Sequence, residues 1–564
     1  MLWSISRMPE AGDKEYAMLC RFCRCSTSSL WHVDAGALCT HGKRACSQGM
    51  ELQRTPRSLR RPISPPPSKA RKIEGEATRA RRVLQSPFRL TKIRDLGPDM
   101  NVDTISLSDL LGDPLISECW QFNYLHDVDF TMSHFDEDTR GLVKVHVVHG
   151  FWKRDDANRV ALEAQASRYG NVKLHAAYMP AMFGTHHSKM MILFRHDDTA
   201  QVIIHTANMI AKDWTNMTNA VWQSPLLPLV NRPSGQTSAT GGVSSLVVGS
   251  GERFKHDLLS YLRAYNSRRS VCTSLVEELN KYDFAAVRGA LIASVPGVHE
   301  IEPDDGETCW GWAAARKTLR SVPIQAGRKS EVVVQISSVA TLGPSDTWLQ
   351  KTLLHSLTSP TKTSEKPAFR IVFPTPDEIR RSLDGYASGG SIHMKIQSAQ
   401  QAKQLQYMRP MLCHWANDAD KGQVLPGNHH EAGRQRAAPH VKTYIRYHEN
   451  SNTMDWALLT SANISKQAWG EAANAAGDIK IASWEIGVMV WPELLTGEPE
   501  TMMVGTFKAD SPSEEALGEI PSATLVGLRI PYNLPLRRYA ATELPWVATA
   551  SYSEPDWRGL TWTK

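Results

Sequence analysis

One short residue pattern occurs twice in this chain, with its two copies 253 residues apart. The first copy is His187-Ser188-Lys189, followed by an apolar run and then by Thr206-Ala207-Asn208. The second is His440-Val441-Lys442, followed by another apolar run and then by Ser461-Ala462-Asn463. The separations from Lys to Asn are 19 and 21 residues. Either copy alone would carry little weight, but the matching pair predicts two structurally similar halves.

The geometry of a strand predicts that each triplet forms one group. Residues i and i+2 of a strand lie on the same face, so the His and Lys of each motif point together. An Asn at the end of the neighbouring strand can reach the same place. Two such triplets, related by an approximate twofold axis, would form one pocket with two His, two Lys and two Asn.

These residue types suit the cleavage of a phosphodiester. Lys and Asn side chains donate hydrogen bonds to the non-bridging oxygens, where negative charge concentrates during displacement at phosphorus. One neutral imidazole can attack the phosphorus, and a protonated imidazole opposite can give its proton to the leaving oxygen. The sequence therefore predicts two displacements through a covalent phosphohistidine.

Strand-like runs alternate with helical patterns, which indicates an α/β architecture. The predicted helices are Arg253–Asn266 and Val276–Tyr282. A boundary near residue 300 would separate an N-terminal domain, 86–300, from a C-terminal domain, 301–564, with one motif in each. The predicted strands are Val143–Val148, Lys189–Phe194, Gln201–His205, Glu331–Ile336, Phe369–Phe373, Val441–Arg446, Asp455–Thr460 and Trp484–Trp491.

The first 85 residues have a different character. They hold 16 basic and 7 acidic residues, a net charge of +9, whereas residues 86–564 have a net charge of −3. Residues 54–82 are basic and proline-rich with little to bury, which predicts a disordered arm. The charge predicts attraction to DNA or a nuclear import signal, and hence a nuclear protein. A small zinc knot stays open as an interpretation of Cys20, Cys23, Cys25, Cys39, His41 and Cys46.

The sequence argues against two classes of protein. No window approaches the ~18 consecutive apolar residues that a membrane-spanning helix needs. Charged residues from Arg7 to Glu15 interrupt the region where a signal peptide would have its apolar core, which argues against secretion by that route. Four widely separated cysteines after residue 50 do not form a disulfide framework, so we expect a reducing compartment.

The two H-x-K…N motifs resemble the signature of the phospholipase D superfamily. The surrounding segments GTHHSKMMILF, HTANMIAKDW, PHVKTY, LLTSANISKQAWG and WEIGV are similar to the tyrosyl-DNA phosphodiesterase family. Typical superfamily members have Asp five residues after each motif Lys, whereas this chain has Phe194 and Tyr447, a mark of the same branch. The similarity runs from about Ser86 into the C-terminal region.

The resemblance implies a fold and an activity. The fold would be two similar lobes, each a mixed sheet flanked by helices, in a pseudo-twofold phospholipase D-like arrangement with the site between them. The activity would be hydrolysis of a 3′-phosphotyrosyl bond in DNA repair, and other 3′ adducts would be processed too. No metal or other cofactor would be needed. The implied partners are single-stranded or duplex DNA 3′ ends that carry a topoisomerase I peptide. The enzyme itself would be a monomer.

The resemblance also implies roles for single residues. His187 would be the nucleophile and His440 the general acid and then base, with Glu485 behind His187. Asn219 would orient His440, at a position where the family usually has Gln. The phosphoryl oxygens would be bound by Lys189, Lys442, Asn208 and Asn463. Phe183 would stack on a base, Ser337, Ser338 and Ser465 would contact DNA phosphates, and Tyr124 and Trp546 would lie near the peptide side. The neighbouring His186 would face the other side of its strand and be structural.

Three alternatives remain at this stage. A metal-dependent nuclease could use the acidic runs Asp136-Glu137-Asp138, Asp197-Asp198 or Asp304-Asp305, although none has the spacing of a metal motif. A lipid-cleaving phospholipase D would use the same pocket chemistry with an apolar entrance. A noncatalytic DNA-binding protein would have lost some of the six central residues, all of which are present.

Overall fold

The computed structural model describes residues 82–230, 246–304, 306–325, 327, 329–358, 366–417, 429–448, 453–514 and 524–563. The predicted basic arm lies outside the described residues except for its last four positions, and the candidate zinc knot lies wholly outside them. Residues 81–564 form one compact unit.

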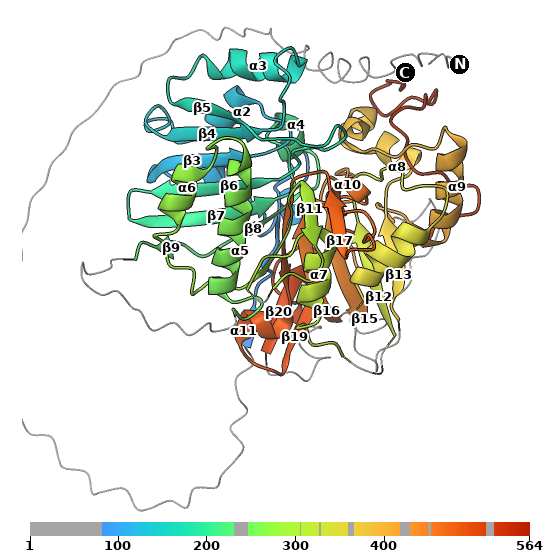
Figure 1. Ribbon diagram of the computed structural model, residues 1–564. Helices are drawn as coiled ribbons and strands as arrows, with labels where there is room; N and C mark the ends of the chain where they lie inside the picture. The colour runs from blue at the N-terminus through green and yellow to red at the C-terminus, as the bar shows by residue number, and fades with distance from the viewer. Residues whose placement is uncertain are drawn as a thin grey trace, which may run out of the picture. The chain divides into compact units, whose positions relative to one another are not determined.

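The first half of this unit contains an eight-stranded sheet in the order β2-β8-β7-β6-β3-β4-β5, with β9 paired to β7. Figure 1 shows it in blue and green. Strand β6 reads MMILFR, and five of its six residues are buried, so it is covered on both faces. The strands are β2 (Arg89–Leu90), β3 (Ile116–Phe122), β4 (Lys144–His149), β5 (Val172–Ala176), β6 (Met190–Arg195), β7 (Thr199–His205), β8 (Ala220–Gln223) and β9 (Leu227–Pro228).

The second half is built on a ten-stranded sheet in the order β1-β20-β19-β16-β15-β12-β13-β14, with β18 between β16 and β10. Its strands are β1 (Arg82–Leu84), β10 (Ala290–Ser294), β12 (Ser330–Gln335), β13 (Ala368–Val372), β14 (Leu412–Cys413), β15 (Thr443–His448), β16 (Thr453–Thr460), β18 (Glu485–Val490), β19 (Thr501–Thr506) and β20 (Thr524–Arg529). A separate two-stranded ribbon pairs β11 (Gly297–Glu300) with β17 (Asp478–Ile481).

The two sheets repeat one topology. In the first, β3, β4 and β5 are parallel neighbours, and β6, β7 and β8 continue antiparallel from β3. In the second, β12, β13 and β14 are parallel neighbours, and β15, β16 and β18 continue antiparallel from β12. Chain order and strand direction agree at all six positions. This confirms the predicted pair of similar lobes.

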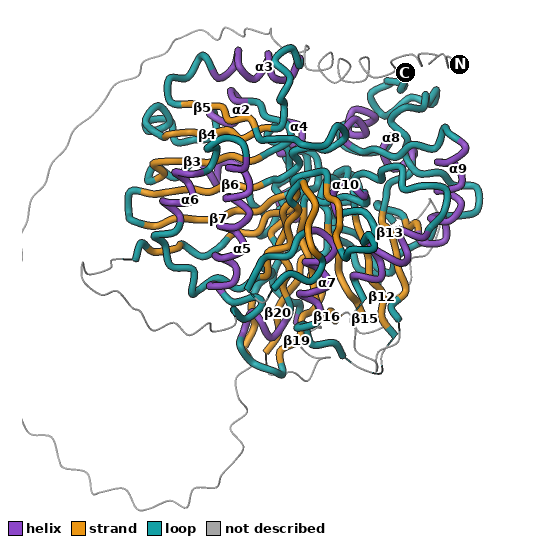
Figure 2. Tube along the Cα trace, in the orientation of Figure 1, coloured by secondary structure: helices purple, strands orange, loops and turns teal. Residues whose placement is uncertain are grey.

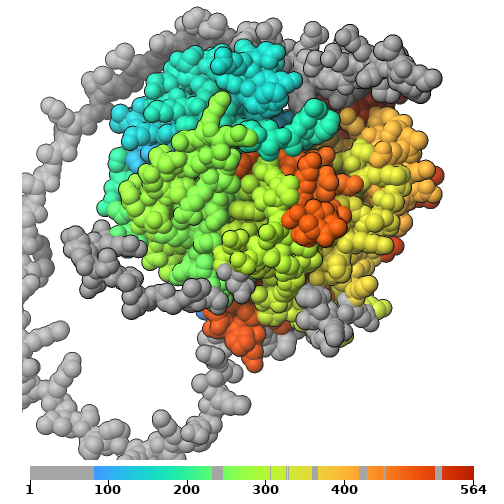
Figure 3. Space-filling model, viewed as in Figure 1, coloured from blue at the N-terminus to red at the C-terminus, as the bar shows by residue number. Residues whose placement is uncertain are grey.

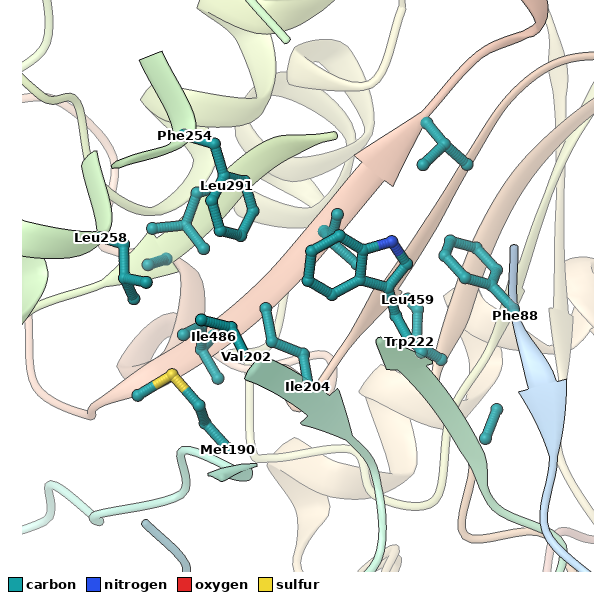
Figure 4. Packing of buried hydrophobic residues seen from close by; sticks show 14 of the residues in the cluster. Phe88, Met190, Val202, Ile204, Trp222, Phe254, Leu258, Leu291, Leu459 and Ile486 are labelled. Carbon is teal, nitrogen blue, oxygen red and sulfur yellow. The ribbon is translucent and has the colours of Figure 1, made fainter. Parts of the chain in front are cut away.

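The two sheets face each other across one apolar layer. Along β6, Met190, Ile192 and Phe194 point into this layer, whereas Met191 and Leu193 point to the opposite face, as the two-residue period of a strand requires. Figure 4 shows the layer, in which Met190, Ile204 and Trp222 of the first sheet lie near Leu459 and Ile486 of the second. Helix α5 (Gly251–Ala264) contributes Phe254 and Leu258 to it; its N-terminus is capped by the Ser250 hydroxyl.

Helices cover the outer faces of both sheets (Figure 2). The outer layer of the first sheet contains α1 (Leu107–Leu111), α2 (Val128–Met132) and α3 (Ala157–Ala166), while α6 (Thr273–Leu279) packs beside α5. The outer layer of the second contains α7 (Gly311–Leu319), the π-helix Leu349–Leu354, α8 (Pro376–Arg380) and α9 (Ala399–Met408). The remaining short helices are α4 (Ala211–Thr215), α10 (Lys466–Trp469) and α11 (Pro492–Thr496). On the face in Figure 3, the first half packs directly against the second.

Two strands pair outside the segments of the chain to which the sequence assigned them. Residues 82–84, which the sequence placed in the disordered arm, form β1 and pair in parallel with β20. Residues 290–294, which the sequence placed in the N-terminal domain, form β10 and pair with β18 of the second sheet. Pairing partners distant in sequence decide both placements. The domain division at residue 300 stays a prediction.

The structural elements confirm the predicted α/β class. All eight predicted strands are present within a few residues of their expected bounds, and the two predicted helices correspond to α5 and α6. Among the described residues, no helix is both long enough and apolar enough to span a bilayer.

Candidate active site

The first motif lies where β6 begins, and its His187 contacts the other half of the molecule. Nδ1 of His187 lies 2.9 Å from Oε2 of Glu485, at the start of β18. The backbone N–H of His187 donates to the carbonyl of Trp484 at 3.0 Å. The side chain of His187 is 16% exposed and that of Glu485 is 5% exposed. The carboxylate is therefore buried behind an imidazole that solvent reaches.

The second motif has the same arrangement with the two halves exchanged, because its His440 contacts a residue of the first half. Nδ1 of His440, before β15, lies 3.3 Å from Oδ1 of Asn219, which precedes β8 of the first sheet. The backbone N–H of His440 donates to the carbonyl of Thr218 at 2.9 Å. Asn219 thus contacts His440 directly, and its amide is fixed by Thr206, whose hydroxyl donates to Oδ1 at 2.9 Å.

Asn219 and Glu485 occupy equivalent positions in the two halves. The N–H of Thr206 donates to the carbonyl of Ala220, one residue after Asn219. The N–H of Ser461 donates likewise to Ile486, one residue after Glu485. The hydroxyl of Ser461 also donates to the Glu485 carboxylate at 2.5 Å, as the Thr206 hydroxyl does to Asn219. Each half therefore supports the histidine of the other.

Both motif lysines are fully buried. Nζ of Lys189 donates to the carbonyl of His187 at 3.4 Å, and Nζ of Lys442 donates to the carbonyl of His440. Each ammonium group is therefore held beside the histidine of its own motif. This common arrangement follows from the i, i+2 spacing, as the sequence predicted.

The two motif asparagines are held by different partners. Oδ1 of Asn463 accepts hydrogen bonds from the backbone N–H groups of Ser337 and Ser338, at 3.1 and 3.0 Å. The amide nitrogen of Asn208 donates to Oδ2 of Asp213 in α4 at 3.0 Å. These contacts fix the two amides just after β7 and β16, the strands that pair with β6 and β15.

Electrostatics link all these groups. Burial lowers the pKa of Lys189 to about 8 and lowers that of Lys442 well below its ordinary value, with the charge of Lys189 adding to the effect on Lys442. Burial also lowers the pKa of His187, against the opposing effect of Glu485. It lowers the pKa of His440 well below the usual value, and both lysines act in the same direction. Burial disfavours the charge on both amines, and a bound oxyanion would favour it, so the pair forms a site suited to an oxyanion.

Two aromatic residues predicted to contact the substrate are Tyr124 and Phe183. The ring of Tyr124, after β3, is 5.9 Å from the His187 ring. Phe183 precedes the motif by four residues and is 78% exposed. An aromatic side chain that exposed has a free face on which a base could stack.

Of the three serines predicted to contact DNA, two hold Asn463 and the third follows it by two residues. Ser337 and Ser338 follow β12 and contact Asn463 as described; Ser337 is buried and Ser338 is half-buried. Ser465 caps α10, where its hydroxyl accepts from the N–H of Ala468 at 3.0 Å. The structure thus places all three at the same strand ends as the second motif.

Trp546, in contrast, is not at the surface of the site. Its indole is fully buried, stacks on Tyr386 and Tyr552, and donates to the carbonyl of Gly389 at 3.0 Å. Its hydrogen bond and ring contacts are thus with the protein itself, and its contact with a bound peptide stays a prediction. In this structure the role of Trp546 is to support the segment that contains Gly389.

His186 has the structural position that its place in the sequence predicted. Its ring points away from His187 into the layer between the sheets, where Nδ1 contacts the carbonyl of Asn123 and Nε2 contacts the hydroxyl of Tyr265, both at 2.9 Å. Burial lowers its pKa to about 3.

Asp213 is the residue of this site that the sequence reasoning missed. Its carboxylate is fully buried, with Oδ2 at 3.2 Å from Nδ1 of His440. It lies five residues after Asn208, and its counterpart five residues after Asn463 is Ala468. The signal that could have found Asp213 is this difference between the two copies, since only the first has a carboxylate five residues after its Asn.

The acidic runs considered for a nuclease have ordinary local contacts. Asp136 accepts backbone N–H groups of its own turn, and Asp197 contacts Arg195. Asp305 lies outside the described residues. Across the part of the chain that is described, no three His, Cys, Asp or Glu side chains are grouped as metal ligands.

A duplicated sheet topology with an H-x-K…N triplet from each copy at the junction defines a phosphodiesterase of the phospholipase D superfamily. More specifically, this chain belongs to the tyrosyl-DNA phosphodiesterase family, whose sequence model matches residues 87–540. It is therefore a hydrolase of a DNA-repair family, as the resemblance implied.

Individual relatives agree with this assignment. A probable tyrosyl-DNA phosphodiesterase of Schizosaccharomyces pombe is 30% identical over 557 residues, covering 88% of this chain and 98% of the relative. Tyrosyl-DNA phosphodiesterase 1 of Arabidopsis thaliana is 27% identical and covers 88% and 80% of the two chains. The crystal structure of yeast tyrosyl-DNA phosphodiesterase superposes with a TM-score of 0.56 at 19% identity, over 82% of this chain and 98% of that one. This last match establishes the shared fold.

Proposed function

We propose that this protein hydrolyses the phosphodiester between a DNA 3′ end and a tyrosine side chain, through a covalent phosphohistidine. The single observation that carries the proposal is the pair of histidines, each held at Nδ1 by a residue of the opposite half. This leaves Nε2 of both rings for chemistry on one phosphorus, while Lys189 and Lys442 supply the positive charge.

In the first step Nε2 of His187 attacks phosphorus. The bond from phosphorus to the tyrosine oxygen breaks, and Nε2 of protonated His440 gives its proton to that oxygen. The products are free tyrosine peptide and DNA joined through its 3′-phosphate to His187. Glu485 accepts a hydrogen bond from Nδ1–H of His187, which keeps the lone pair on Nε2 and stabilises the positive charge that develops on the ring.

In the second step water attacks the phosphorus from the side that tyrosine has left. His440, now neutral, takes a proton from the water while the bond between phosphorus and nitrogen breaks. The products are DNA with a 3′-phosphate and free His187. Lys189, Lys442, Asn208 and Asn463 bind the non-bridging oxygens in both steps, which stabilises the additional charge of each transition state.

We further propose that the DNA strand approaches over Phe183 and past Ser337, Ser338 and Ser465. Stacking on an exposed aromatic ring holds a base regardless of its identity, and hydroxyl groups can donate to backbone phosphates. Tyr124, whose ring is 5.9 Å from the His187 ring, would contact the tyrosine or peptide. Action on DNA also supports a nuclear location, with the basic arm serving in attraction to DNA or in nuclear import.

A labelled oligonucleotide with a 3′-phosphotyrosyl peptide tests the function directly. We expect release of the peptide and formation of a 3′-phosphate end, whereas the same peptide attached at the 5′ end and phosphatidylcholine should be poor substrates. Efficient cleavage of phosphatidylcholine, with the 3′-phosphotyrosyl oligonucleotide left intact, would favour a lipid phosphodiesterase instead. Binding of DNA without turnover of any substrate would favour a noncatalytic protein.

A further inference from the structure

The carboxylate of Asp213 connects a phosphate-binding residue with the general acid. Oδ2 of Asp213 accepts both the backbone N–H of Asn208, at 2.7 Å, and its side-chain amide, at 3.0 Å. The same oxygen lies 3.2 Å from Nδ1 of His440. Asp213 thus has contacts on one oxygen with residues from both halves.

Pseudo-symmetry shows why this contact matters. His187 has one acidic neighbour at Nδ1, Glu485, and the position equivalent to Glu485 behind His440 is the uncharged Asn219. An amide can fix the tautomer of neutral His440, but it cannot balance the charge of a protonated ring. Asp213, from α4, supplies the missing negative charge at nearly the same distance from Nδ1 as Asn219. Each histidine therefore has one carboxylate, taken from a different structural element.

We propose that Asp213 is the counter-ion of protonated His440, and so the positioning residue that makes His440 a general acid, while Asn219 fixes the ring. This inference rests on the function proposed above. A protonated ring and an ionised carboxylate buried side by side are more stable than either ion buried alone. The two donors of Asn208 on Oδ2 also favour the ionised carboxylate, because it acts purely as an acceptor.

The other charges around His440 make such a counter-ion necessary. Lys442, Lys189, His187 and Lys212 all disfavour its protonation, and so does burial. Burial raises the pKa of Asp213 itself, and Lys212, Lys442 and Lys189 act against that rise. Asn208 contacts Asp213 and would also bind a phosphoryl oxygen. A chain of contacts would therefore connect the bound phosphate, through Asn208 and Asp213, to the ring of His440.

The dependence of rate on the leaving group separates this role from a packing role. A tyrosine oxygen leaves poorly without a proton, whereas para-nitrophenol is much more acidic and needs little help. General acids contribute about 10²–10⁴-fold to a rate. We expect Asp213→Asn to slow single-turnover cleavage of a 3′-phosphotyrosyl oligonucleotide about 10- to 100-fold. Cleavage of the matching 3′-para-nitrophenyl ester should change less than about threefold. The rate of tyrosyl cleavage should also begin to fall at a lower pH than in the wild type. The reason is that loss of the carboxylate lowers the pKa of His440, so the ring loses its proton at lower pH.

Two further variants serve as controls. Asp213→Glu keeps the charge but alters the size, so the ratio of tyrosyl to nitrophenyl rates should stay near the wild-type ratio, even if Asp213→Asn fails to fold. Glu485→Gln should slow both substrates alike, because it acts on the nucleophile.

Equal losses on both substrates with Asp213→Asn, or a changed ratio with Asp213→Glu, would overturn the role of Asp213 as counter-ion. Failure of wild-type protein to cleave the tyrosyl oligonucleotide would instead overturn the proposed function. The two failures are therefore distinguishable.

Discussion

The imidazole of His187 and the carboxylate of Glu485 lie 2.9 Å apart, although 298 residues separate them in the chain. The contact joins the segment just before β6 in the first sheet to the first residue of β18 in the second. It can exist only when the two halves are packed together. The proposed nucleophile is therefore completed by the same event that buries the apolar layer between the sheets.

Glu485→Gln should reduce the rate of the first chemical step about 100-fold. The amide can still accept a hydrogen bond from His187, but it no longer stabilises positive charge on the attacking ring. Single-turnover release of tyrosine peptide measures this step. Thermal unfolding of the variant provides the control for folding, and an unchanged rate in a folded variant would contradict the role of Glu485.

Substitutions of the two histidines should fail differently. His187→Ala should abolish peptide release and form no adduct, because the nucleophile is absent. His440→Ala should slow hydrolysis of the intermediate more than its formation, since a phenol with a pKa near 10 leaves without a proton donor more readily than water attacks without a base. Denaturing gels run at neutral pH should show protein joined to the labelled 3′ end. An adduct with the His187 variant would reverse the assignment.

Activity should persist in the presence of a chelator. Lys189 and Lys442 lie where they can supply the positive charge that a divalent ion supplies in other phosphodiesterases. The measurement is peptide release in excess EDTA, compared with the same protein in added magnesium. Complete loss of activity in EDTA, restored by magnesium, would show that the mechanism needs a metal.

Deletion of residues 1–80 should leave cleavage of a short oligonucleotide nearly unchanged and make binding to long duplex DNA less sensitive to salt. The deleted segment contains most of the basic excess, and each phosphate neutralised by Lys or Arg contributes to the salt dependence. Affinity measured at several salt concentrations tests this, and equal slopes would exclude the segment from DNA contact. Deletion to residue 85 should lower the unfolding temperature as well, because it also removes β1 from β20.

Binding of the product should be linked to proton uptake above neutral pH. Burial lowers the pKa of Lys189 to about 8 in the free site, and a bound phosphate raises it again by favouring the charged amine. The affinity for an oligonucleotide with a 3′-phosphate should therefore fall as the pH rises through 8. Calorimetry in buffers of different ionisation enthalpy counts the protons taken up. Lys189→Met should take up fewer protons, and equal uptake would assign the effect to another group.

The repeated motifs determined much of this protein before any fold was known. Because i and i+2 share a face in a strand, the spacing of His187 and Lys189, and of His440 and Lys442, fixed the arrangement within each motif. Strands such as β6 and β16 were predictable from their continuous apolar runs. Strand β3 (ISECWQF) was not among the predicted strands, because polar residues interrupt its apolar pattern and neighbours on both sides define it.

Only the tertiary structure decided which residues support each histidine and which predicted contacts are accessible. The resemblance placed Trp546 near the peptide side, and the structure stacks its indole on Tyr386 and Tyr552. No sequence pattern singled out Asp213, yet it lies against a histidine 227 positions later in the chain. Contacts of this kind depend on how two sheets pack, and no local periodicity records them. The sequence therefore determined the chemistry of each half, and the packing of the halves decided how that chemistry is controlled.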